Sequence, residues 1–139
     1  MDDSKRRLKG SEKRDIFKQM HKSLNASFYA LDIDFCLISK HPPGVVALLD
    51  YKDPNDHVTF SEALFYGWWL DMCPVPIYIV EASDPKNGPF TIKEYLGGDY
   101  HPEPPVITWG MSMIAPDWEA FGKWERELRT QYWKNGGWK

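Results

Sequence analysis

Residues 28–52, FYALDIDFCLISKHPPGVVALLDYK, hold two apolar runs joined by a short turn, and this stretch decides the fold. The first run, residues 28–38, is rich in β-branched and aromatic residues, which favours a strand. HPPG at residues 41–44 is typical of a turn. Residues 45–52 are a second apolar run. The pattern predicts a β-hairpin.

Three ionisable residues lie in or at the ends of these strands: Asp34, Asp50 and Lys52. Burying a charge is costly unless it is paired or bound to metal. Asp50 and Lys52 are two residues apart and so share a strand face. Asp34 lies on the neighbouring strand, about 4.8 Å away in a paired sheet. Asp32 shares the face of Asp34, and the choice between the two stays open.

Two carboxylates, a backbone carbonyl and waters form a hard oxygen site that suits Mg²⁺ or Mn²⁺. A lysine ammonium beside such a site positions the attacking water and offsets negative charge on a phosphate. This combination is typical of phosphodiester hydrolysis. The alternative is structural: Asp50 and Lys52 at the solvated end of a strand, and Asp34 a satisfied carboxylate.

Further elements are predicted on both sides of the hairpin. Thr59 and Glu62 form a T-x-x-E capping box, which predicts the start of a helix. The predicted helices cover residues 11–25, 59–72 and 116–132, and the further predicted strands cover residues 75–82 in the sheet interior, 90–96 at an edge and, more briefly, 106–109. The order predicts an α/β or α+β fold in a single domain over residues 11–139, after a basic tail at 1–10.

Composition supports one domain that folds without disulfides or a structural metal. The chain has 139 residues, 42% of them hydrophobic and 15% aromatic. Its only cysteines, Cys36 and Cys73, exclude a four-cysteine zinc or iron–sulfur site. No run approaches the roughly 20 apolar residues that span a bilayer. We therefore expect a cytoplasmic protein that contacts no membrane.

Charge is unevenly distributed along the chain. Residues 1–14 hold six basic and three acidic residues, leaving eleven basic and seventeen acidic residues in the remainder. An acidic body argues against strong nonspecific binding of duplex nucleic acid. We therefore expect a homodimer or a protein partner to supply affinity. The basic N-terminus is either a solvated tail or an arm that contacts phosphate.

The motifs IDF at 33–35 and LLDYK at 48–52 resemble those of the PD-(D/E)XK nuclease superfamily, and most closely those of RecB-like nuclease domains. Those domains carry a Q-x-x-x-Y motif on the following helix, where this chain has Glu62 and Tyr66. The resemblance covers residues 11–96. It implies a restriction-endonuclease-like core, with a central mixed sheet of about four strands flanked by helices.

Carried over by position, the resemblance implies a role for each residue. Asp34 and Asp50 bind Mg²⁺ or Mn²⁺, with His21 on the first helix as a further metal candidate. Lys52 is the catalytic lysine. The last two residues, Glu62 and Tyr66, support the site or the DNA. The implied function is metal-dependent hydrolysis of DNA, leaving a 5′-phosphate and a 3′-hydroxyl.

Departures from the motif keep a second function open. Ile33 stands for the nominal proline, and Glu62 replaces glutamine, which adds negative charge near a phosphate. The alternative is a non-catalytic protein that retains the nuclease fold and binds nucleic acid or protein. A third possibility is an interaction domain in which the motif is coincidental.

Purely structural interpretations of the supporting residues also stay open. The capping box alone explains Glu62, Tyr66 is as well suited to a core, and His21 to a helix surface. Trp118 and Trp124 lie on the apolar arc of the last predicted helix. The helix tryptophans pack on the sheet, form a dimer contact or offer a platform for base stacking.

Overall fold

The computed structural model describes residues 10–22 and 34–138. The chain divides into two compact units, Met1–Ala30 and Leu31–Lys139. In the first unit, helix α1 covers Gly10–Lys22. A helix is therefore present where one was predicted, and the predicted last residues, 23–25, lie outside the described part of the chain.

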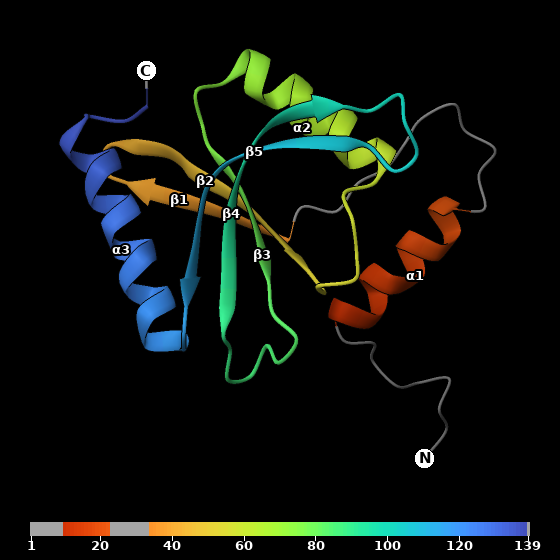
Figure 1. The fold of residues 1–139 in the computed structure, drawn as a ribbon, viewed down its shortest axis with the longest axis horizontal. Helices are drawn as coiled ribbons and strands as arrows, with labels where there is room; N and C mark the ends of the chain where they lie inside the picture. The colour runs from red at the N-terminus through yellow and green to blue at the C-terminus, as the bar shows by residue number, and fades with distance from the viewer. Residues whose placement is uncertain (1–9, 23–33, 139) are drawn as a thin grey trace. The chain divides into compact units, whose positions relative to one another are not determined.

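The second unit is an α+β structure built on a five-stranded mixed sheet (Figure 1). Its elements are β1 (Phe35–Lys40), β2 (Pro43–Lys52), α2 (Phe60–Met72), β3 (Ile77–Glu81), β4 (Phe90–Asp99), β5 (Val106–Ala115) and α3 (Trp118–Lys134). The strands lie in sequence order across the sheet. Of the described strands, β2 and β3 alone pair in parallel, because helix α2 provides the crossover that a parallel pair requires.

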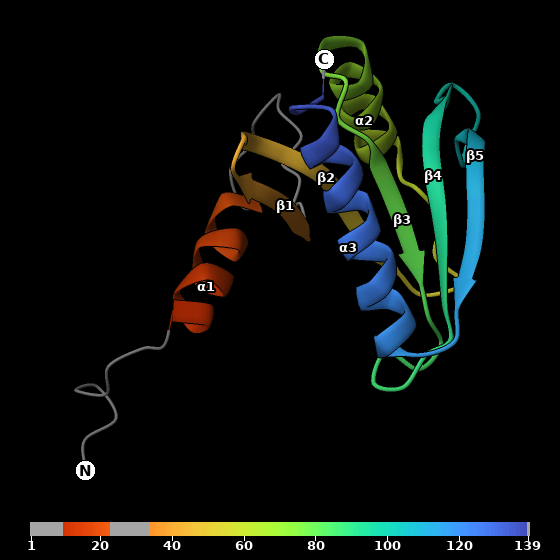
Figure 2. The same cartoon turned by 90° about the vertical axis from the view of Figure 1, so that its left-hand side faces the viewer.

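The two faces of the sheet carry separate cores, because successive side chains on a strand point to opposite faces. One face packs against α3, where Tyr78 meets Trp124 with ring centroids 4.9 Å apart. The other face packs against α2, where Tyr66 meets Tyr95 at 5.4 Å. Figure 2 shows α3 running along one side of the strands. The α2 face carries the polar residues of interest.

The predicted hairpin is confirmed, with Phe35 opposite Leu49 and a register shift between Leu37 and Ile38. The start of β2 is held by α3 and by the segment that follows, where Nε1 of Trp138 donates to the carbonyl of Val46 at 2.8 Å. The hydroxyl of Tyr132 donates to the carbonyl of Pro42 at 3.1 Å. These contacts fix the start of β2 and, through it, the register of the hairpin.

The sheet differs from the prediction at its far edge. It has five strands instead of about four, because residues 106–115 form a full strand where only 106–109 was expected. The prediction that residues 90–96 form an edge strand is wrong, because β5 pairs with β4 from Phe90 to Asp99. The interior position of β3 is confirmed. Among the described residues, no helix combines the length and apolar character needed to cross a bilayer.

Gly44 offers a test of how the hairpin turn is held. Its φ is 156°, and a Cβ there would overlap the hydroxyl of Tyr132. Gly44→Ala should therefore lower the free energy of unfolding by about 1–3 kcal/mol, measured by urea denaturation. Gly10→Ala is the matched control, since nothing lies within 4 Å of a Cβ at that position. Equal stability of the two variants would contradict this packing.

Candidate active site

The end of β2 places two charged side chains on the α2 face of the sheet. Asp50 pairs with Ile79 and Lys52 with Glu81 in the parallel register of β2 and β3. Asp50 is only 6% exposed, a rare degree of burial for a carboxylate. Its burial follows from its place in β2, because it continues the buried run that begins at Val46. A buried carboxylate needs partners, and neighbouring elements provide them.

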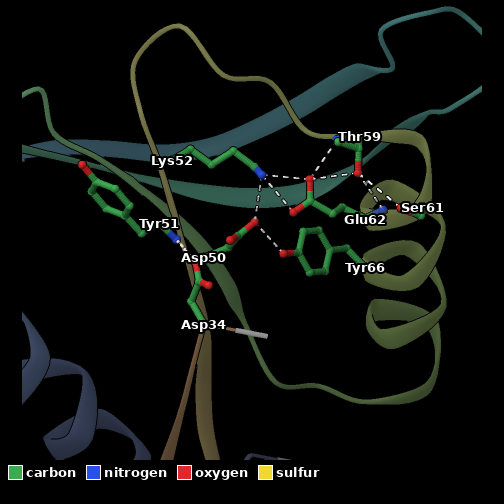
Figure 3. A network of polar contacts seen from close by, with 8 residues as sticks. All are labelled: Asp34, Asp50, Tyr51, Lys52, Thr59, Ser61, Glu62 and Tyr66. Atoms are coloured by element: carbon green, nitrogen blue, oxygen red, sulfur yellow. Dashed lines mark hydrogen bonds and ion pairs between the residues drawn. The ribbon is translucent and has the colours of Figure 1, made fainter. Parts of the chain in front are cut away.

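Asp34 lies directly before β1 and reaches across the hairpin to β2. Its carboxylate accepts a hydrogen bond from the backbone N–H of Tyr51 at 2.8 Å. Its carboxyl group also lies close enough to that of Asp50 to raise the pKa of Asp50. Figure 3 shows the two carboxyl groups side by side. The hairpin therefore brings together the two carboxylates that the sequence analysis paired, whereas Asp32 lies outside the described residues.

Lys52 is bound by two carboxylates. Its Nζ lies 2.8 Å from both side-chain oxygens of Glu62 and 3.5 Å from Oδ2 of Asp50. Glu62 also caps α2, because its Oε1 accepts from the backbone N–H of Thr59 at 2.9 Å. The side chain of Glu62 thus caps α2 and binds Lys52 at the same time (Figure 3).

Tyr66 completes the group from the next turn of α2. Its hydroxyl donates to Oδ2 of Asp50 at 2.7 Å. The side chain is 3% exposed and its ring packs against Tyr95. Tyr66 is thus both a core residue and a partner of Asp50. Of the predicted site residues, Asp34, Asp50, Lys52, Glu62 and Tyr66 converge; His21 lies in α1, and its side chain is outside the described part.

Burial and neighbours shift the pKa values of the group. Burial, followed by the hydrogen bond to Asp34, raises the pKa of Asp50 to about 7, although Tyr66 and Lys52 oppose the shift. Burial alone would lower the pKa of Lys52, but Glu62 and Asp50 outweigh it and the pKa is raised. Burial would likewise raise the pKa of Glu62, but Lys52 and Thr59 lower it. Near neutral pH, Lys52 and Glu62 are charged, and Asp50 is partly protonated.

Comparison with known proteins gives no relative. No family model, curated protein or solved structure matches the chain. The chemistry of the site therefore has to be inferred from its own side chains.

The donor set suits a hard cation that keeps most of its waters. Among the residues that the structure describes, no group of three or more His, Cys, Asp and Glu is placed to hold a metal ion. Asp34 and Asp50 supply two neighbouring carboxylates, and burial, followed by the proximity of Asp34, raises the pKa of Asp50. Mg²⁺ is commonly bound by one or two carboxylates plus waters and substrate phosphate. The pair fits that pattern.

A second polar pair, not predicted from the sequence, lies on the same face. Glu81 and Lys93 form an ion pair at 2.7 Å, and the ammonium of Lys93 lies 4.3 Å from the ring centroid of Trp109. Glu81 is the partner of Lys52 in the strand register. Glu81 could have been found from the sequence, because it is a charged residue at the end of an apolar strand, as Asp50 is.

Asp50 makes stability depend on pH. Its folded-state pKa of about 7 exceeds the ordinary aspartate value of 3.8, so the folded state holds the proton more tightly than the unfolded chain. This contribution is complete below pH 4 and is lost as pH rises to about 7. Asp50→Asn, which resembles the protonated carboxyl, should flatten that fall, which we expect to be on the order of 1–4 kcal/mol.

The pH effect is measured by urea denaturation between pH 4 and 8. Asp71→Asn, at an exposed position near the end of α2, is the control and should keep the wild-type profile. A wild-type stability that rises across this range, or an unchanged profile in Asp50→Asn, would contradict the placement of Asp50.

Proposed function

We propose that this chain is a metal-dependent nuclease of the PD-(D/E)XK type that hydrolyses DNA phosphodiester bonds. One observation carries the proposal: the hairpin brings the carboxyl groups of Asp34 and Asp50 side by side (Figure 3), with the ammonium of Lys52 3.5 Å from Oδ2 of Asp50. Paired carboxylates beside a fixed cation are suited to bind a divalent metal and a phosphate together. The hairpin motif that resembles RecB-like domains supplies all three residues.

Each residue has a role in the proposed reaction. Asp34 and Asp50 would hold Mg²⁺ or Mn²⁺. Bound metal would lower the pKa of a coordinated water and polarise the phosphate. Lys52 stays cationic because of its two acidic neighbours, so it can orient the attacking water and stabilise charge that develops on the phosphate. Tyr66 fixes the Asp50 carboxylate through its hydrogen bond.

Glu62 is compatible with this chemistry despite standing where related motifs have glutamine. Its two oxygens are each 2.8 Å from Nζ of Lys52, and one also accepts from the cap at Thr59. Its negative charge is therefore matched by an adjacent positive charge. Glu62 sets the position of the Lys52 ammonium and acts through it.

The second candidate is a non-catalytic protein that retains the nuclease fold and binds nucleic acid or protein. The same ion pair favours it, because both oxygens of Glu62 engage Lys52 and compete with a phosphate for the ammonium. Coincidental resemblance is the weaker explanation, since unrelated residues have no reason to converge. Metal binding and cleavage separate the two candidates.

Metal binding is tested by thermal unfolding with increasing Mn²⁺ in place of Mg²⁺. A ligand that binds only the folded state stabilises it by about 2.7 kcal/mol at one hundred times its Kd. The wild type should show a rising Tm, and the rise should be lost in Asp50→Asn and retained in Asp71→Asn. An equal rise in Asp50→Asn would place the metal elsewhere.

Cleavage is tested on single-stranded, duplex and branched DNA with Mg²⁺ and with Mn²⁺. Asp50→Asn and Lys52→Ala should each reduce the rate at least about a hundredfold, because each removes a group that acts on the transition state. The products should carry a 5′-phosphate and a 3′-hydroxyl. Metal-dependent stabilisation without cleavage of any substrate would favour the non-catalytic candidate.

A further inference from the structure

A concave surface lies between the β1–β2 turn and the carboxyl-terminal half of α3. It has a volume of about 430 Å³ and is lined by His41, Arg126, Arg129, Thr130 and Trp133; we call it the basic concavity. Its lining residues come from α3 and from the turn at the start of β2. None of them belongs to the candidate active site.

The spacing along α3 explains why these side chains gather. Arg126, Arg129 and Trp133 follow each other at intervals of three and four residues, so they share one side of the helix. The buried face of α3 is formed by other residues, among them Leu128 and Tyr132. The bond from Tyr132 to Pro42 holds this end of α3 against the turn that carries His41.

The arginines of the basic concavity, Arg126 and Arg129, are exposed and make no short ion pair within the described part of the protein. The remainder of the chain beyond residue 14 is acidic, with eleven basic and seventeen acidic residues. Two exposed arginines on one side of a helix can attract an anion even on an acidic protein.

Trp133 narrows the choice of anion. Its side chain is 65% exposed, unlike that of Trp124 on the buried face of the same helix, which is 7% exposed. An exposed indole beside arginines suits a nucleic acid whose bases are free to stack, with the guanidinium groups on its phosphates. Duplex DNA keeps its bases stacked inside, so the combination fits a single strand.

We propose that the basic concavity binds single-stranded DNA, with Arg126 and Arg129 on backbone phosphates and Trp133 stacked on a base. The concavity lies beside the start of β2 and Asp50 lies near its end, so about 23 Å of extended strand separates Pro43 from Asp50. That the bound DNA is also the substrate rests on the proposed function. That the basic concavity binds DNA does not.

The test measures binding of fluorescein-labelled dT20 by anisotropy, with EDTA present so that no cleavage occurs. Two phosphate contacts to a single strand predict a slope of about −1.4 in log affinity against log salt concentration. Arg126→Gln and Arg129→Gln should each reduce that slope by about 0.7. Trp133→Ala should weaken binding about 5- to 150-fold, and Trp133→Phe should restore much of the loss.

Lys86→Gln is the matched control, since it removes one positive charge from the exposed β3–β4 turn, outside the basic concavity. It should leave affinity unchanged, and a 20-base-pair duplex should bind more weakly than dT20. Absence of dT20 binding at low salt, equal losses in Lys86→Gln and Arg126→Gln, or tighter binding of the duplex would overturn the proposal.

The two proposals fail separately. If dT20 binding depends on Arg126 and Trp133 but no cleavage occurs in Mg²⁺ or Mn²⁺, the DNA-binding proposal stands and the nuclease proposal fails. If cleavage depends on Asp50, and Arg126→Gln and Trp133→Ala change neither cleavage nor binding, the nuclease proposal stands and the DNA-binding proposal fails.

Discussion

The close approach of the carboxyl groups of Asp34 and Asp50 is the constraint on which the site depends. Two carboxyl groups in contact repel each other when both are ionised, so one must hold a proton or the pair must hold a cation. The structure partly compensates this charge with the hydroxyl of Tyr66 and the ammonium of Lys52. The pKa of Asp50 is still raised, first by burial and then by Asp34. In the proposed function, a bound divalent cation would supply the further positive charge.

The crossover between the parallel strands β2 and β3 links the fold to the site. A parallel pair needs a long connection, and in this sheet the connection is α2, which begins over the end of β2. The residue that completes the capping box of this helix, Glu62, is also the one that holds Lys52. The same carboxylate therefore caps the helix and positions the lysine, and a change at Glu62 removes both contacts.

Much of this arrangement could be predicted because its signals are local. The two apolar runs that carry Asp34 and Asp50, with the turn between them, predicted the hairpin, and the spacing of Thr59 and Glu62 predicted the cap. The Glu62–Lys52 ion pair was not predicted, because capping already explained the glutamate and nothing in the sequence measures a distance across ten residues. The motif also gave no measure of how deeply Asp50 is buried.

The far edge of the sheet and the basic concavity were missed for a different reason. Gly97 and Gly98 are typical of a loop, yet they extend β4 through irregular pairing with β5. The arginines of α3 lie off its apolar arc, and hydrophobic periodicity reports only the buried side of a helix. Their meeting with His41 depends on how α3 packs against the hairpin turn, which is a tertiary property.

A crystal structure of the protein soaked in Mn²⁺ tests the central claim most directly, because anomalous scattering locates the ion. We predict one ion ligated by carboxylate oxygens of Asp34 and Asp50, with the ammonium of Lys52 nearby. Carboxyl groups with no ion between them at saturating Mn²⁺, or an ion bound only at other residues, would contradict it.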